Sequence, residues 1–338
     1  MLKKLLVRLL RRKSADVGIC QRARSVLIRP AGSALGDAVV LTASLAQLKE
    51  VLPDVKIGIL VNDRNREIFS FCPLVDALIN DRFSEVWRQR NKWDVFIEYT
   101  PVFRSRWIWY CYLLHSHFSI AFAKKPKSNY TMDNVHVYDC YCPQAVDYHI
   151  NQWLTLTPFG VDNTARYVLD KPKCTNPYPD DKKLHILLTP YGTSRKLDPH
   201  IFAQAIAANN SPSVSFYLLN QPQAVEYMHA CKQYAPQADV RWGDSPTLQD
   251  FLAYVYYADA VVSIDSVAVH LCGAYERPLL ALYANFMQNV RYIGPLAQPQ
   301  TELLLSDKVA TNNDDFSSFS ADTIAAGIRR LIARVSVK

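Results

Sequence analysis

Several features of membrane and secreted proteins are missing from this chain of 338 residues. No run reaches the roughly 18 to 20 uncharged apolar residues that a membrane-spanning helix needs. The first residues are basic and partly apolar, but Arg8 interrupts the apolar run and no small-residue cleavage site follows, so they do not form a secretory signal. We therefore expect the protein to stay in the cytoplasm.

Metal, redox and common nucleotide motifs are missing as well. The eight cysteines are scattered, and the spacing of Cys140 and Cys142 matches neither a zinc knuckle nor a C-x-x-C motif, so we expect free, buried thiols. The chain has no full G-x-G-x-x-G and no P-loop, which disfavours dinucleotide and P-loop proteins. We find no internal repeat and no low-complexity tract.

About half of the residues are hydrophobic and a fifth are charged, which is the composition of a globular protein. The chain is long enough for two domains. Its net charge of +7 lies entirely in residues 1–24, so the remaining body is formally neutral. This distribution disfavours a nucleic-acid-binding body. Within the tail, Leu2, Leu5, Leu6 and Leu9 recur at helical spacing opposite the cations, a pattern typical of a helix lying on an anionic membrane. The alternative is that the tail packs on its own domain or on a partner subunit.

Strand and helix patterns alternate through the body, which predicts parallel sheets with crossover helices. The first half shows three strands, near 26–28, 55–61 and 95–97, and an irregular, aromatic and basic region at 99–142 that we interpret as an inserted loop-and-helix region. The second half is more regular. It predicts a doubly wound domain with five strands, near 184–189, 214–219, 239–242, 260–264 and 278–283, followed by a helix capped by Ser320.

These patterns predict two Rossmann-like domains. We expect a basic amphipathic tail at 1–24, a first Rossmann-like domain at 25–170, a linker at 171–183, a second Rossmann-like domain at 184–319 and a C-terminal helix at 320–338.

Three polar turns follow predicted strands at their carboxyl ends, where doubly wound sheets bind ligands. The first runs from Arg29 and brings Gly32, Gly36 and Asp37 to the start of a helix. Glycines let a substrate approach the backbone, and Asp37 is a candidate base. Alternatively, Asp37 only caps the helix dipole.

The other two turns lie in the second half. One contains Gly192, Thr193, Ser194 and Lys196 before a helix, a pattern that favours the binding of phosphate oxygens. The alternative is an ordinary polar loop in which Asp198 caps the helix. The third contains Asp265, Ser266 and His270. We expect Asp265 to cap its helix, although a single helical histidine is more often structural than a ligand.

Together the three turns resemble those of glycosyltransferase family 9, the lipopolysaccharide heptosyltransferases. The stretch from Arg29 to Thr42 is similar to the opening motif of that family, and the stretch from Asp265 to Leu271 is similar to its Asp-[ST]-Gly-x-x-His-Leu motif. The likeness runs from about residue 25 to 335. Two departures, Val267 in place of Gly and Tyr283-Ala-Asn-Phe in place of Gly-Pro-Thr, lie near the expected donor pocket.

The resemblance implies a GT-B fold and an inverting glycosyltransferase that needs no metal and no cofactor, in agreement with the absence of a D-x-D motif. It implies that the first domain, 25–170, binds the acceptor and that the second, 184–319, binds the nucleotide sugar. It also implies that Asp37 is catalytic and that Thr193, Ser194, Lys196, Asp265, Ser266 and His270 bind the donor. The candidate acceptor contacts are then cations of the first domain: Arg64, Arg104, Arg106 and Lys124. The resemblance further implies an ADP-heptose donor, a lipid-linked glycan acceptor of the lipopolysaccharide core and a place on the inner face of the inner membrane of a Gram-negative bacterium. A nucleotide-sugar epimerase and a non-catalytic sugar-nucleotide-binding module are the alternatives.

Overall fold

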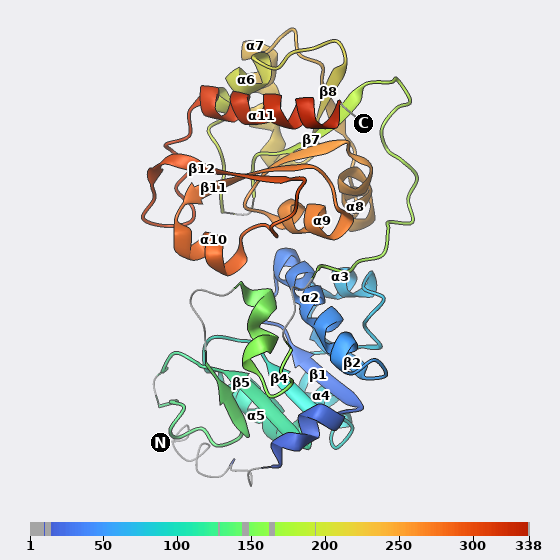
Figure 1. Cartoon of the computed structure of the whole chain (residues 1–338), viewed down its shortest axis with the longest axis vertical. Coiled ribbons are helices and arrows are strands. Elements are labelled where there is room, and N and C mark those ends of the chain that lie inside the picture. Colours follow the sequence, from blue (N-terminus) through green and yellow to red (C-terminus); the bar gives the residue numbers. More distant parts are fainter. Residues whose placement is uncertain are drawn as a thin grey trace. The chain divides into compact units, whose positions relative to one another are not determined.

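The computed structural model describes residue 10 and residues 15–127, 129–143, 149–161, 166–192 and 194–336. Thr193 and nearly all of the predicted membrane-binding helix lie outside these ranges. The chain divides into two compact units, Met1–Asp170 and Lys171–Lys338 (Figure 1).

The first unit is built on a six-stranded parallel sheet in the order β3-β2-β1-β4-β5-β6. Its inner strands are almost continuously apolar and buried, as expected for a parallel sheet covered on both faces. The strands are β1 (Ser25–Arg29), β2 (Lys56–Val61), β3 (Ala77–Asn80), β4 (Val95–Glu98), β5 (Phe118–Phe122) and β6 (Cys140–Cys142).

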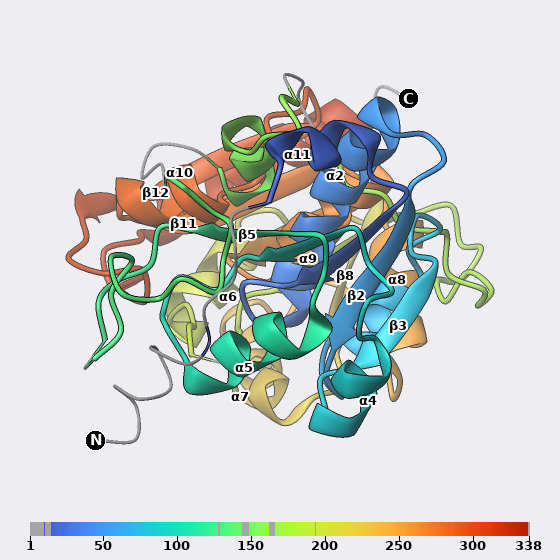
Figure 2. The ribbon, with the colours of Figure 1, turned by 90° about the horizontal axis from the view of Figure 1, so that it is seen from below.

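Helices cover both faces of this sheet. Figure 2 shows α2 on one face and α4 with α5 on the other, and α2 also packs against α3 and η2. The helical elements are η1 (Val17–Arg22), α2 (Leu35–Val51), α3 (Arg66–Ser70), α4 (Phe83–Arg88), α5 (Ser105–Leu114) and η2 (Ile150–Leu156).

The prediction of an inserted region at 99–142 is wrong. This region contains α5 and the sheet strands β5 and β6, and it supplies buried residues to the hydrophobic core. The aromatic side chains that obscured its periodicity are core residues, because Trp107 and Tyr110 are both buried. The short strand β3 was also missed.

The second unit has a six-stranded parallel sheet in the order β12-β11-β10-β7-β8-β9. All five predicted strands are present, and β12 is a sixth that the sequence did not reveal. The strands are β7 (Leu184–Thr189), β8 (Val214–Leu219), β9 (Val240–Gly243), β10 (Ala260–Ile264), β11 (Leu279–Asn285) and β12 (Thr301–Val309).

The helices of the second unit agree with the predicted alternation. Asp198 caps α6, and Ser320 caps the C-terminal helix α11, whose Ile324, Ile328 and Leu331 are fully buried. The helices are α6 (Pro199–Ala207), η3 (Pro222–Ala224), α7 (Val225–Tyr234), α8 (Leu248–Tyr257), α9 (Val267–Tyr275), α10 (Met287–Ile293) and α11 (Ala321–Val335).

Numbered within its own unit, each sheet has the strand order 3-2-1-4-5-6, the arrangement of the Rossmann fold. The predicted fold class, two Rossmann-like domains of the GT-B type, is therefore confirmed. In such sheets ligands bind beyond the carboxyl ends of the strands, where the strand order reverses. This places the functional turns of the two units after β1 and β7.

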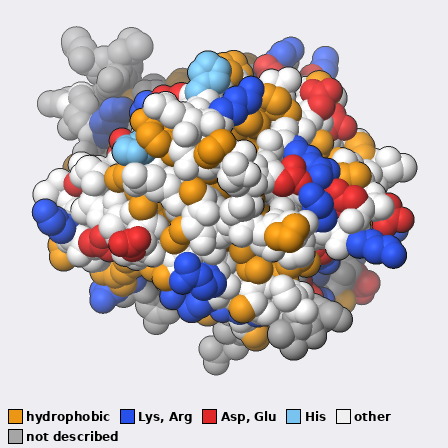
Figure 3. Space-filling model, turned by 90° about the horizontal axis from the view of Figure 1, so that it is seen from above, with side chains coloured by type: hydrophobic (Ala, Val, Ile, Leu, Met, Phe, Trp, Pro, Cys, Tyr) orange, Lys and Arg blue, Asp and Glu red, His pale blue; other side chains and the backbone are white. Residues whose placement is uncertain are grey.

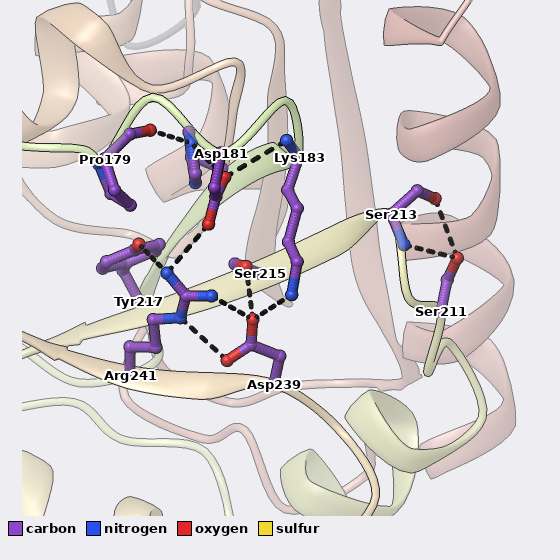
Figure 4. Close-up of polar contacts among 10 residues, drawn as sticks. Pro179, Asp181, Lys183, Ser211, Ser213, Ser215, Tyr217, Asp239 and Arg241 are labelled. Atoms are coloured by element: carbon purple, nitrogen blue, oxygen red, sulfur yellow. Dashed lines mark hydrogen bonds and ion pairs between the residues drawn. The ribbon is translucent and has the colours of Figure 1, made fainter.

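An ion-pair network closes the opposite, amino-terminal edge of the second sheet (Figure 4). Asp239 accepts hydrogen bonds from Arg241 at 2.6 Å, Lys183 at 2.7 Å and Ser215 at 2.6 Å, while Arg241 also bonds to Asp181 at 3.0 Å. These bonds hold the end of the predicted linker against β8 and β9. Because the cations stabilise its carboxylate, the pKa of Asp239 lies well below its usual range.

In the part of the chain that the structure describes, no helix is long and apolar enough to cross a membrane. All eight cysteines are free thiols. On the face seen in Figure 3, acidic and basic side chains are interspersed, in agreement with the formally neutral body.

Candidate functional site

Asp37 lies in the first turn of α2, at the carboxyl end of β1. Its carboxylate faces Gly32 so closely that a Cβ atom on Gly32 would lie 1.8 Å from Oδ2. No side chain fits there, so the glycine in the turn allows the carboxylate to occupy this position. The N-cap is Ala34, which has no capping side chain, and the backbone N–H of Ala34 donates to Asp37.

The surroundings of Asp37 favour a carboxyl group that takes up a proton. Burial is the larger influence and raises its pKa, while the hydrogen bond from Ala34 lowers it by less. A small cavity of about 10 Å³, about enough for one water, adjoins the carboxylate. It is lined by Ala31, Asp37, Val40, Leu41, Tyr99 and Ile150. Asp37 therefore has the properties of a base as well as of a helix-start residue.

Glu98, at the end of β4, anchors a buried polar network beside this turn. Lys124 Nζ lies 3.0 Å from Glu98 Oε1, and both side chains are almost inaccessible to solvent. Thr100 and Tyr138 also donate to Glu98 through their hydroxyls. The prediction that Lys124 contacts an acceptor does not fit this placement, because its ammonium group is enclosed and already paired. The pair explains instead why a cation occurs in an apolar stretch.

The other three predicted acceptor cations, unlike Lys124, are exposed. Arg106 is held by Asp81 at 3.1 Å and by the Tyr110 hydroxyl at 2.9 Å, and its guanidinium packs over the rings of Trp107 and Tyr110. Arg104 is the N-cap residue of α5. Arg64 lies in the turn after β2, where its backbone N–H donates to the side-chain oxygen of Asn62 at 3.0 Å.

In the second unit, Arg195 and Asp265 form the centre of the candidate donor site. Arg195 Nη1 donates to the main-chain oxygen of Asp265 at 3.2 Å and also to its carboxylate, while Nε donates to Asp314 at 2.9 Å. Asn289 donates to the same carboxylate oxygen of Asp265 at 2.9 Å. We refer to these four residues, Arg195, Asp265, Asn289 and Asp314, as the donor cluster.

The donor cluster brings together the turns after β7 and β10, the start of α10 and the segment after β12. Asp265 is only 6% exposed. Its burial raises its pKa, and the neighbouring positive charge of Arg195 opposes that rise. The prediction that Asp265 caps α9 is wrong: the cap is Ser266, whose hydroxyl accepts from the N–H of Ala268 at 3.3 Å. The Asp265 carboxylate orients Arg195 instead.

The structure separates Lys196 from this cluster. Its ammonium group lies 3.3 Å from Glu226 of α7, and both side chains are largely exposed. Ser194 is exposed in the same turn and Gly192 is half-buried, with its N–H donating to the oxygen of Arg195 at 2.7 Å. Of the two adjacent cations, Arg195 is the one that reaches the α9 turn.

His270 lies within α9 and is 3% exposed. This burial agrees with the structural alternative for a helical histidine. Ser266 is half-buried at the start of the same helix, and its hydroxyl lies 3.0 Å from that of Ser263. Ser266 and the first amides of α9 are therefore nearer the ligand edge of the sheet than His270.

Comparison with solved structures adds a decisive observation about the fold. *E. coli* ADP-heptose lipopolysaccharide heptosyltransferase II aligns with 92% of this chain and 99% of its own, at a TM-score of 0.71 and 14% identity. The chain has the heptosyltransferase fold. A family 9 glycosyltransferase from *Veillonella parvula* aligns with 92% of this chain and 97% of its own, at a TM-score of 0.69 and 13% identity.

A third structure with this fold, *E. coli* heptosyltransferase WaaC with ADP, aligns with 91% of this chain and 99% of its own, at a TM-score of 0.66 and 15% identity. No protein-family profile matches the chain, and no curated protein sequence matches it. Among the residues that the structure describes, no group of three or more metal-ligating side chains is arranged to hold a metal ion.

Sequence reasoning missed several site residues. Glu98 could have been recognised from the sequence, because it is a carboxylate at the end of the apolar strand β4. Arg195 was missed, because its neighbour Lys196 was chosen as the phosphate cation. Asn289 and Asp314 gave no signal, because they reach the donor cluster only through folding from 24 and 119 residues away.

Proposed function

We propose that this protein is an inverting glycosyltransferase that transfers a sugar from a nucleotide-diphosphate donor to a glycan acceptor. The observation that carries the proposal is the half-buried carboxylate of Asp37, packed against Gly32 at the carboxyl end of β1 in a heptosyltransferase fold. The fold supplies the class of enzyme, and this carboxylate supplies the base that such a reaction needs.

In the proposed reaction, Asp37 accepts the proton of an acceptor hydroxyl as that oxygen forms a bond to the anomeric carbon of the donor. The bond from this carbon to the diphosphate breaks, and its electron pair leaves with the nucleotide diphosphate, so the configuration inverts. The raised pKa of Asp37 suits this role, because a general base works best when its pKa is near the operating pH.

The donor diphosphate is proposed to bind at the donor cluster, next to the first amides of α9. The N-terminus of this helix favours an anion, and the guanidinium of Arg195 is held beside it. Arg195 uses Nε and Nη1 for contacts within the described residues, which leaves Nη2 for phosphate oxygens. We propose that Arg195, rather than Lys196, is the phosphate cation.

The sugar is proposed to be a heptose and the nucleotide ADP. WaaC has been solved with ADP and with ADP-2-deoxy-2-fluoro heptose, and this chain shares its fold. The acceptor is proposed to be a lipid-linked glycan of the lipopolysaccharide core, reached from the cytoplasmic face of the inner membrane of a Gram-negative bacterium. The basic charge of residues 1–24 supports a location at an anionic surface.

The test combines a donor screen with a variant. The protein is heated with a panel of nucleotide sugars, since a bound ligand adds RT ln(1 + [L]/Kd) to the free energy of unfolding and so raises the unfolding temperature. The best donor is then incubated with candidate acceptors, and nucleotide release is measured for the parent and for Asp37→Asn. Stabilisation by ADP-heptose and acceptor-dependent release that falls in the variant support the proposal.

Other outcomes identify the alternatives. A product formed from the donor alone, without acceptor, indicates an epimerase. Donor binding with no acceptor-dependent release in the parent, and no change on Asp37→Ala, indicates a sugar-nucleotide-binding module. Either result overturns the proposed transfer.

A further inference from the structure

The exposed aromatic side chains of the first unit are concentrated on two helices. Among the described residues of Met1–Asp170, the exposed large aromatics are Phe83 and Trp87 of α4 and Trp109 of α5, which are 58%, 52% and 39% exposed. Phe83 and Trp87 are four residues apart and so share one face of α4. The two helices lie side by side on one face of the sheet (Figure 2).

Positive charge surrounds these rings. Residues 81–92 and 104–114 contain six cations and two carboxylates; the cations are Arg82, Arg88, Arg90, Lys92, Arg104 and Arg106. This local excess stands out because the body of the chain is formally neutral. The guanidinium of Arg90 lies 5.7 Å from the ring centre of Trp87, so cations and exposed rings are presented together.

The surface between the helices is hollowed. A cavity of about 530 Å³ is lined by Arg82, Phe83, Arg106, Trp109 and Tyr110, and its lining is predominantly apolar. Arg106 is fixed there by Asp81 and Tyr110, whereas no hydrogen bond or ion pair joins the Arg82 side chain to a described residue. An apolar hollow bordered by arginines matches the boundary between acyl chains and phosphate headgroups.

The basic N-terminal segment is connected to the same side of the unit. Leu10 is buried and belongs to the hydrophobic cluster that contains Trp107, Ile108 and Tyr110 of α5. At this position the tail packs on its own domain.

We propose that α4 and α5 form a docking surface for an anionic lipid bilayer, with Phe83, Trp87 and Trp109 entering the interface and the surrounding arginines contacting lipid phosphates. Aromatic rings and arginines are the residues enriched at membrane–water boundaries. Contiguous exposed apolar surface on an otherwise polar protein marks an interaction site. A bilayer fits better than a protein partner, because the excess of six cations over two carboxylates matches a uniformly anionic surface.

Phe83, Trp87 and Trp109 belong neither to the tail nor to the residues proposed for catalysis. The test is co-sedimentation of the full-length protein with vesicles of phosphatidylglycerol and phosphatidylethanolamine, without donor or acceptor, so its outcome does not depend on the proposed transfer. In the triple variant Phe83→Ser, Trp87→Ser, Trp109→Ser, we expect the ratio of bound to free protein to fall about tenfold. Since these side chains are exposed, the variant keeps the unfolding temperature of the parent.

The matched control is Trp242→Ser. Trp242 is 41% exposed on β9 of the other unit, so its replacement removes an equally accessible ring while vesicle binding stays at the parent value. A second measurement uses bromine-labelled lipids, which should quench tryptophan fluorescence in the parent and less in Trp87→Ser, Trp109→Ser. Unchanged sedimentation of the triple variant, or an equal loss in Trp242→Ser, overturns the proposal. Parent protein that binds neutral phosphatidylcholine vesicles equally well also overturns it.

Discussion

Arg195 donates from Nη1 to the main-chain oxygen of Asp265 at 3.2 Å, across 70 residues of sequence. The contact joins the turn after β7 to the turn after β10, and it fixes a guanidinium beside the start of α9. Lys196, the next residue, points to Glu226 of α7. We therefore expect replacements of these two adjacent cations to affect donor binding differently.

Replacing Arg195 with Ala should weaken binding of ADP by about 2 kcal/mol, or roughly thirtyfold, the scale of hydrogen bonds to a charged group. Lys196→Ala is the matched control and should change the dissociation constant by no more than about twofold, since an exposed ion pair contributes little. Titration calorimetry below the unfolding temperature of each variant measures both. A larger loss in Lys196→Ala would return the phosphate role to the lysine.

Asp37→Asn should lower turnover by about a hundredfold or more, the scale of a positioned proton transfer. It should not lower stability, because the amide removes a buried carboxylate whose charged form is penalised by desolvation. Steady-state nucleotide release and thermal unfolding test the two parts. Normal turnover would leave Asp37 as a helix-start residue only.

The pH dependence of kcat/KM should also test whether Asp37 acts as the base. Burial raises the pKa of Asp37, and the base acts only when deprotonated, so kcat/KM should fall with acidification at a pH above the ordinary pKa of aspartate. The pH dependence of stability has the opposite sign to that of activity. A raised folded-state pKa means that this carboxyl contributes stability as pH falls through its folded pKa. Activity and unfolding are measured between about pH 4 and 8, and an activity limb at the ordinary value would contradict the burial argument.

Gly32→Ala should reduce turnover without preventing folding, because its Cβ would collide with Asp37 Oδ2 and displace the carboxylate. The collision is with the end of a side chain, which can rotate away. In an Asp37→Ala background there is no carboxylate to displace, so adding Gly32→Ala should cost no further activity. Equal losses in both backgrounds would show that the glycine acts independently of Asp37.

The network around Asp239 predicts acid sensitivity of the second unit. In the folded protein the pKa of Asp239 is depressed, chiefly by hydrogen bonds from Arg241. The carboxylate therefore contributes stability that is complete above the pKa of aspartate in the unfolded chain. This contribution is lost as the pH falls from there toward the folded-state pKa. Asp239→Asn should therefore lower the unfolding temperature at pH 7 and reduce the loss on acidification. Asp16→Asn, which removes an exposed pair with Arg22, serves as control. Identical pH dependence in Asp239→Asn and parent contradicts this account.

Deleting residues 2–13 should weaken, but not abolish, co-sedimentation with anionic vesicles, and should reduce its sensitivity to salt. Basic residues near an anionic surface contribute about 1 kcal/mol each, and ions screen that attraction. The measurement is repeated at low and high salt. Undiminished binding of the truncated protein would eliminate the tail as an anchor.

A structural feature could be predicted from the sequence when the pattern that produces it is local. Strands such as β10 and the turn at Asp37 were predictable, because apolar runs and glycines act within a few residues. The strands β5 and β6 were not, because the buried aromatics of α5, which precedes both strands, hide the periodicity of this region. The Arg195–Asp265 contact was also hidden, since nothing local tells which of two adjacent cations faces inward.

The shared strand order of the two sheets has a chemical consequence. The chain follows the same path twice with no detectable repetition of sequence. Asp37 and Arg195 both come after the first strand of their sheets, Asp37 in the first turn of the following helix and Arg195 in the loop before the following helix. One half presents a carboxylate there and the other presents a guanidinium with a fixed positive charge. In the reaction that we propose, the position after the first strand would accept a proton in one half and bind an anion in the other, and the charge of one side chain would distinguish the two halves.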